Sequence, residues 1–214
     1  MKYLIISILM FCSVFGARAQ TVGEIFVAMP DELIVQLEKA WRKDLVDLYK
    51  SGKDATLENT MQGTSTLKTL TDDYILLQTT ERSTMEIRRL PLINNTYVVC
   101  VITTVYAPVA DSRVHFYTTD WHRLSPDGIF SPLQRDAFLK NDADTSQPSY
   151  MEAMTALDIC LVKYSLNADN NDLTAEYTTL QYLSEETRLR VKPFIKDVIK
   201  VYNWKSGHYD MSND

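Results

Sequence analysis

The chain has 214 residues, and its 22 Lys and Arg against 28 Asp and Glu give a formal net charge of −6. Apolar residues make up 45% and charged residues 23% of it, with only 6 Gly and 7 Pro. These values are typical of globular proteins and exclude a disordered tail, a collagen-like repeat and a disulfide-dense miniprotein. The acidic balance also argues against nucleic-acid binding, which needs a basic surface.

Residues 1–19 have the three parts of a secretory signal peptide, namely Lys2, an apolar run over 4–15, and the small residues Ala17 and Ala19. A transmembrane helix needs about 20 apolar residues, so this run is too short to be an anchor. We expect cleavage after Ala19, which leaves residues 20–214 with 20 basic and 28 acidic residues. No other long apolar stretch follows, so we expect a soluble periplasmic or extracellular protein without a transmembrane segment.

Three cysteines are present, and the first of them lies in the leader. Lipid attachment at Cys12 is disfavoured, because the bulky Met10 and Phe11 precede it. Cys100 and Cys160 both lie in apolar runs. Export permits a disulfide between them, and the alternative is two buried free thiols that act as small apolar side chains.

The first predicted element of the processed chain is an amphipathic helix over residues 31–50. Its apolar residues recur at intervals of three or four, as on one face of a helix, and most charged residues, Arg42 among them, fall off that face. The apolar face consists of Leu33, Leu37, Trp41, Leu45 and Leu48.

Next come four β-branched and aromatic runs separated by short polar breaks, which predicts an antiparallel meander. These predicted strands cover residues 74–80, 84–88, 97–106 and 113–119. The second half predicts a short helix over 131–140 that begins at Ser131 and Pro132, a polar loop over 141–149, and strands over 156–166 and 173–182. A helix then opens at Ser184 and is stopped or kinked by Pro193, and a last strand covers 198–204.

This order of elements predicts an α+β fold, mainly antiparallel, with an N-terminal amphipathic helix and two shorter helices packed on the sheet or sheets. We expect residues 20–214 to form a single domain, or two subdomains over about 20–130 and 131–214.

Three segments resemble a family of exported Bacteroidales proteins that is classed only as a domain of unknown function. They are residues 70–78, 83–87 and 111–121, and the string Phe-Tyr-Thr-Thr-Asp-Trp over 116–121 is the most specific part. The resemblance covers most of the processed chain. It implies a secreted or periplasmic protein and supplies neither an activity nor catalytic residues.

The sequence lacks the motifs of several classes of enzyme and cofactor-binding site. The sequence has neither of the glycine-rich phosphate loops and no GxSxG. It has no HExxH, and its only histidines are His115, His122 and His208, so we expect no zinc site and no cofactor. The alternation Asn167, Asp169, Asn171 is superficially similar to a calcium loop but lacks glycine at the sixth position, so a hairpin turn explains it better.

Two functional hypotheses remain. In the first, the chain is a non-catalytic binding or envelope-associated module for a protein or glycan partner. Its candidate surface follows one strand and the end of that strand, because exposed aromatic rings beside a carboxylate stack on sugars or grip a partner loop; the alternative is that the rings fill the core. The candidate binding residues are Arg113, His115, Tyr117, Asp120 and Trp121.

The second hypothesis is a glycosidase-like hydrolase that uses two carboxylates among Asp72, Asp73 and Glu86. However, Asp72 suits a turn or cap, and Glu86 alternates with Met85 and Ile87 as a solvent-facing residue would. The sequence therefore favours the binding module.

Overall fold

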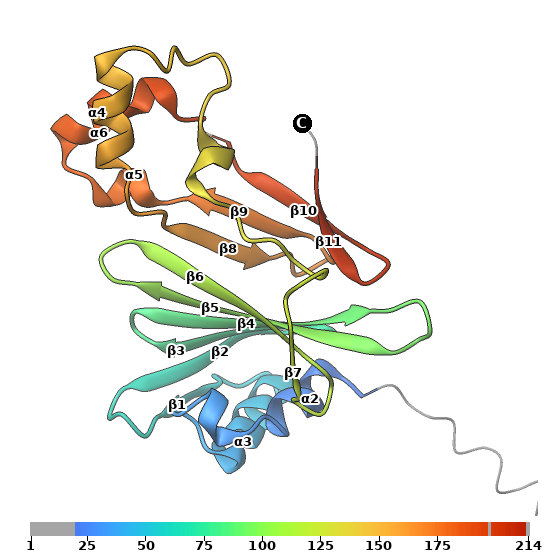
Figure 1. The fold of residues 1–214 in the computed structure, drawn as a ribbon. Coiled ribbons are helices and arrows are strands. Elements are labelled where there is room, and N and C mark those ends of the chain that lie inside the picture. Colours follow the sequence, from blue (N-terminus) through green and yellow to red (C-terminus); the bar gives the residue numbers. More distant parts are fainter. Residues whose placement is uncertain (1–19, 197, 213–214) are drawn as a thin grey trace, which may run out of the picture.

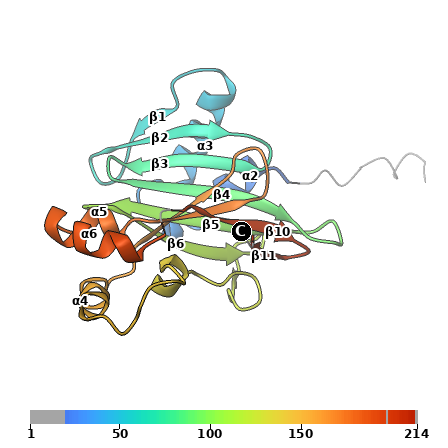
Figure 2. The same cartoon turned by 90° about the horizontal axis from the view of Figure 1, so that it is seen from above.

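The computed structural model describes residues 20–196 and 198–212. The predicted signal peptide lies outside the described residues. The fold is α+β, as predicted, and its sheets are antiparallel. Figure 1 shows three layers, in which two N-terminal helices cover one face of a large sheet and a smaller sheet covers the other face. Figure 2 shows the same arrangement from above.

The large sheet is a seven-stranded meander in which the strands pair in chain order. The four predicted strands are confirmed as β3 to β6, whereas β1 and β2 were not predicted. β1 has only 3 residues, β2 is rich in threonine, and only Ser65 and Leu67 of β2 are buried. Hydrophobic periodicity therefore gives little signal for them. The strands are β1 (Thr56–Glu58), β2 (Thr64–Leu70), β3 (Tyr74–Thr80), β4 (Ser83–Pro91), β5 (Tyr97–Tyr106), β6 (Ala110–Tyr117) and β7 (Arg123–Leu124).

The small sheet has four strands in the order β11-β10-β9-β8. Strands β8, β9 and β10 correspond to the three strands predicted in the second half of the chain. The predicted segments for β8 and β9 were too long, and the final hairpin strand β11 was not predicted. The strands are β8 (Val162–Leu166), β9 (Leu173–Tyr177), β10 (Lys200–Lys205) and β11 (His208–Met211).

The N-terminal layer consists of α2 (Val22–Val27), the 3₁₀ turn η2 (Asp31–Leu33) and α3 (Lys39–Lys50). The prediction of one helix over residues 31–50 was therefore wrong at its start. Ile34 has non-helical backbone angles, and both Ile34 and Leu37 are buried. Apolar residues at helical spacing thus reach the core from a turn as well as from a helix.

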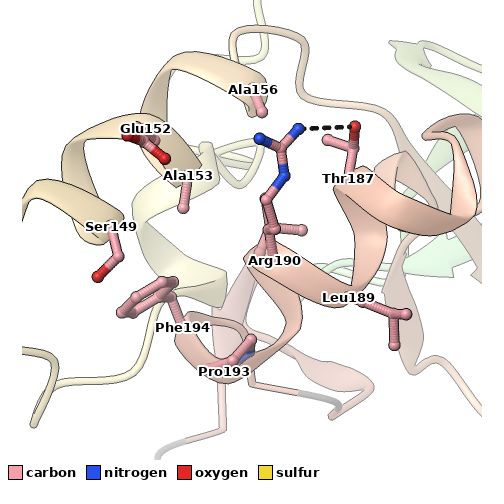
Figure 3. A pocket seen from close by; sticks show the side chains of 10 residues that line it. Ser149, Glu152, Ala153, Ala156, Thr187, Leu189, Arg190, Pro193 and Phe194 are labelled. Atoms are coloured by element: carbon pink, nitrogen blue, oxygen red, sulfur yellow. Dashed lines mark hydrogen bonds between the residues drawn. The ribbon is translucent and has the colours of Figure 1, made fainter.

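The remaining helices are short and lie at one end of the small sheet (Figure 1). They are η3 (Arg135–Phe138), α4 (Pro148–Ala156), α5 (Thr179–Tyr182), α6 (Glu185–Val191) and η4 (Lys192–Phe194). The helix predicted over 131–140 is only the turn η3, and α4 was not predicted. The predicted helix after Ser184 is confirmed, since the Ser184 hydroxyl accepts a hydrogen bond from the Thr187 N–H. Helices α4 and α6 pack beside each other (Figure 3).

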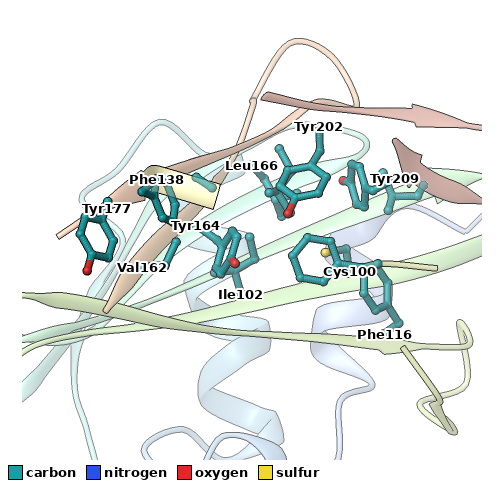
Figure 4. Close-up of a cluster of buried hydrophobic side chains, with 14 of the residues drawn as sticks. Cys100, Ile102, Phe116, Phe138, Val162, Tyr164, Leu166, Tyr177, Tyr202 and Tyr209 are labelled. Carbon is teal, nitrogen blue, oxygen red and sulfur yellow. The ribbon is translucent and has the colours of Figure 1, made fainter. Parts of the chain in front are cut away.

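Two apolar cores flank the large sheet. The core between the sheets is rich in aromatic side chains from both of them, including Phe116, Tyr164 and Tyr209 (Figure 4). The other core packs α2 and α3 against the opposite face through Phe26, Leu45 and their neighbours. Both faces of the large sheet are therefore covered, and this changes how its polar residues must be interpreted.

Arg42 of α3 is fully buried, contrary to the prediction that it lies off the apolar face. Its guanidinium donates hydrogen bonds to the carbonyl of Phe26 in α2, at 3.2 Å, and to the carbonyls of Met29 and Leu37 in the segment between α2 and α3. It also pairs with the Asp31 carboxylate at 2.7 Å. One side chain thereby fixes the irregular segment that joins the two helices.

We expect Arg42→Met to lower the free energy of unfolding by at least about 3 kcal/mol, because it leaves several buried carbonyls without donors. Urea unfolding measures this change. Lys43→Met, at the neighbouring exposed position, is the control; it removes only the exposed ion pair with Asp47 and should lower the free energy of unfolding by less than about 1 kcal/mol. An equal midpoint for both variants would contradict the role given to Arg42.

Candidate functional site

Glu86 of β4 faces the small sheet and is only 7% exposed. The prediction that it faces solvent was wrong, because its neighbours Met85 and Ile87 lie in the helix–sheet core and Glu86 lies on the other covered face. Its carboxylate accepts hydrogen bonds from the Tyr74 hydroxyl and the Leu166 N–H, each at 2.9 Å. Burial raises the pKa of this carboxyl group, and the hydrogen bond from Tyr74 opposes that shift.

Side chains of the large sheet cover the open edge of β8. That strand pairs only with β9, so alternate N–H groups of β8 have no strand partner. The Val162 N–H donates to Asp111 Oδ1 at 3.3 Å, and the Tyr164 N–H donates to Ser112 Oγ at 3.0 Å. The Leu166 N–H completes the series with Glu86. Buried backbone donors are thus satisfied and the edge is closed to further pairing.

Arg88, two residues beyond Glu86, holds the hairpin between β8 and β9. Its guanidinium donates to Asn171 Oδ1 at 2.9 Å and to the Asn167 carbonyl at 2.7 Å. The alternation that superficially resembled a calcium loop is therefore a turn whose oxygens bind an arginine. In the described part of the chain, no cluster of three or more His, Cys, Asp or Glu is arranged to bind a metal.

The three carboxylates of the hydrolase hypothesis have separate surroundings. Asp73 is paired with Arg89 at 2.6 Å, and Glu86 is enclosed between the sheets. Asp72 lines a surface groove of about 470 Å³ beside Lys50, and neither Asp73 nor Glu86 is among the residues of that groove. No described groove contains two of these three acids.

Two of the five candidate binding residues, Tyr117 and Trp121, lie in the helix–sheet core with their rings 5.4 Å apart. The Trp121 indole donates to the Ile25 carbonyl at 2.9 Å, which ties the end of β6 to α2. These rings therefore pack the interior and offer little surface to a ligand.

The next two candidates lie near the same end of β6 but do not join one surface feature. His115 is half-buried and lies 3.1 Å from Arg123, and burial together with that positive charge lowers the pKa of its imidazole. Asp120 is exposed in the turn after β6, where hydrogen bonds from Thr118 and His122 lower the pKa of its carboxyl group.

The fifth candidate, Arg113, lines the largest groove that we describe, about 530 Å³ in volume. We call it the edge groove. It lies where the β5–β6 hairpin meets the segment before β8 and the end of α5. It is lined by Thr103, Val105, Ala107, Pro108, Val109, Asp111, Arg113, Ile159, Leu161 and Tyr182.

Sequence reasoning missed most of the edge groove. Val105, Ile159 and Tyr182 are 48%, 43% and 48% exposed, which is unusual for large apolar side chains. Val105 and Tyr182 were assigned to predicted strands, and Ile159 belonged to a run that was predicted to be a buried strand. The fold brings these three side chains together, and this proximity identifies them as one surface.

Cys100 and Cys160 are both free thiols. Cys100 lies in the core between the sheets, whereas Cys160 is half-buried beside the edge groove. Burial raises the pKa of the Cys160 thiol, which opposes formation of a reactive thiolate. In the structure, neither cysteine forms a disulfide.

We expect the stability advantage of wild type over Glu86→Gln to shrink as the pH rises from the pKa of an unfolded glutamate through the raised pKa of folded Glu86. An unfolded glutamate ionises near about 4.3, while burial raises the pKa of Glu86 in the folded state. The unfolded state therefore releases its proton first, and folding loses stability as the pH rises through that window. Urea unfolding at several pH values measures this, with exposed Glu81→Gln as control. A pH-independent difference between wild type and Glu86→Gln would contradict the argument.

Within the described residues, no helix is both long and apolar enough to span a lipid bilayer. A family model described as "Protein of unknown function (DUF3256)" matches residues 14–209. The solved structure of a domain of an uncharacterized protein from Porphyromonas gingivalis W83 is similar, with a TM-score of 0.81 and 29% sequence identity over 89% of this chain and 98% of that chain. The search of curated proteins found no match. The predicted resemblance to a Bacteroidales family of unknown function is thereby confirmed, and the chain belongs to the DUF3256 family.

Proposed function

We propose that this protein is an exported, non-catalytic binding module whose ligand occupies the edge groove. The observation that carries the proposal is the convergence of exposed apolar and charged side chains there. Val105, Ile159 and Tyr182 come from three separate segments and surround the groove with Asp111 and Arg113. Exposed apolar surface rimmed by polar groups is typical of interaction sites.

The walls of the groove are held together before any ligand binds. Asp111 accepts the Val162 N–H, and the Thr178 hydroxyl donates to the Ala110 carbonyl at 2.6 Å. The Thr179 hydroxyl accepts the Leu161 N–H at 2.8 Å. A site that is ordered in advance loses less conformational entropy when it binds, which favours affinity.

The groove offers contacts of two kinds. Tyr182 presents an aromatic ring that can stack on a sugar or pack against an apolar side chain. Arg113 is exposed and forms no ion pair with any residue that the structure describes, so its guanidinium is available to a polar ligand group. Both a protein loop and a glycan match this combination.

Export is supported by the start of the folded chain. Thr21 caps α2 through a capping box with Glu24, and the Gln20 carbonyl accepts a hydrogen bond from Arg89. Gln20 and Thr21 would both remain after cleavage at Ala19, so these contacts would be kept.

For the ligand site, we expect Tyr182→Ala and Arg113→Glu each to weaken ligand binding at least tenfold. The ligand is first obtained by affinity capture from envelope extract and by a glycan array, with recovery on wild type as the reference. The matched controls Tyr106→Ala and Arg82→Glu change exposed residues outside the groove and should bind as wild type does. Equal binding by both groove variants would place the ligand elsewhere.

For export, we expect the intact mass of the protein from a periplasmic fraction to correspond to a chain that starts at Gln20. Bulky residues at the cleavage site block the peptidase, so Ala17→Phe and Ala19→Phe should yield the uncut chain. Recovery of the full-length wild-type protein from the cytosol alone would contradict export.

A further inference from the structure

A second surface lies at the C-terminal end of α6 and the segment that follows it, where basic residues outnumber acidic ones. Between Arg188 and Lys200 the sequence has five basic residues and one acidic residue, in a chain whose formal net charge is −6. Leu189 of α6 is also 64% exposed. A large apolar side chain that is exposed in a predominantly basic segment is typical of interaction sites.

Two grooves lie on either side of Leu189, and both are lined by Leu189 and Pro193. The first, about 320 Å³, lies between α4 and α6, and Figure 3 shows Arg190 beside it. The second, about 390 Å³, lies between α6 and the segment after η3. The second groove is lined by Lys140, Leu180, Leu189, Lys192, Pro193 and Ile195.

The cations of these grooves have few partners. Lys140 and Lys192 line the same apolar groove, and neither forms an ion pair or a side-chain hydrogen bond with any described residue. Among the residues that the structure describes, Arg190 donates a hydrogen bond to the Thr187 hydroxyl alone, at 3.4 Å. Arg190 near the C-terminal end of α6 is favourable for the helix dipole, but Lys140 lies outside any helix, so the dipole does not explain its position.

We propose that this α6 surface, consisting of Lys140, Leu189, Arg190 and Lys192, binds an acidic segment of a partner protein. Apolar side chains of that segment fill the two grooves, and its carboxylates pair with the three cations. Charge complementarity supports this occupant, because Lys140 and Lys192 line one groove and neither pairs with a carboxylate of any described residue. A lipid surface fits less well, since a flat bilayer would leave two concave grooves unfilled.

The test is a random library of peptides about 12 residues long, displayed on phage and selected on the purified protein. We expect the selected peptides to combine Asp or Glu with apolar residues. Each should bind Lys140→Glu/Lys192→Glu and Leu189→Asp at least tenfold more weakly, and its affinity for wild type should fall with added salt. Lys68→Glu, an exposed change on β2, is the control and should bind as wild type does.

Three results would overturn this proposal. The first is selection of no peptide, and the second is selection of peptides that bind the double lysine variant as well as wild type. The third is sedimentation of the wild type, but not of the double variant, with phosphatidylglycerol vesicles when no peptide is selected, because the surface would then contact lipid. Peptides that bind the α6 surface should keep their affinity for Arg113→Glu, whereas peptides that bind the edge groove should lose it, so failure of the edge-groove proposal is distinguishable from failure here.

Discussion

The fold depends on how the small sheet closes against the large one, and the edge of β8 is where this is decided. An edge strand placed against a sheet must find acceptors for its outward N–H groups, because unsatisfied buried donors are costly. Asp111, Ser112 and Glu86 supply these acceptors from β6 and β4. Glu86 is therefore a structural group, although a buried carboxylate with a raised pKa would also suit a catalytic acid.

The same contacts shape the edge groove. Asp111 both accepts the Val162 N–H and lines the groove, so the closure that completes the core also fixes one wall of the proposed binding surface. The hairpin of β5 and β6 and the residues before β8 are distant in sequence but are held as one unit. The proposed binding surface and the stability of the fold thus share Asp111, whereas Tyr182 and Arg113 lie on the exposed side of that unit.

Much of the fold follows from local pattern, and the failures have physical causes. Strands β3 to β6 are long and β-branched, and hydrophobic periodicity identified them. β1 has only 3 residues and β2 is rich in threonine, so they have little apolar signal. Arg42 and Glu86 were misplaced for a shared reason. Alternation and helical spacing indicate which face a residue lies on, but they do not indicate whether another layer covers that face.

The candidate surfaces show the same limit on what sequence patterns can predict. Arg113 was found because it belongs to a recognisable strand, while Ile159 and Tyr182 reach the groove only through tertiary packing. The α6 surface was not predicted for another reason. The net charge of −6 is a sum over the whole chain and does not report where basic residues gather. Charge segregation appears when Lys140 is brought beside Lys192 by the bridge between Leu139 and Ile195. Sequence therefore predicts surfaces that follow a single element, and surfaces assembled from several elements require the fold.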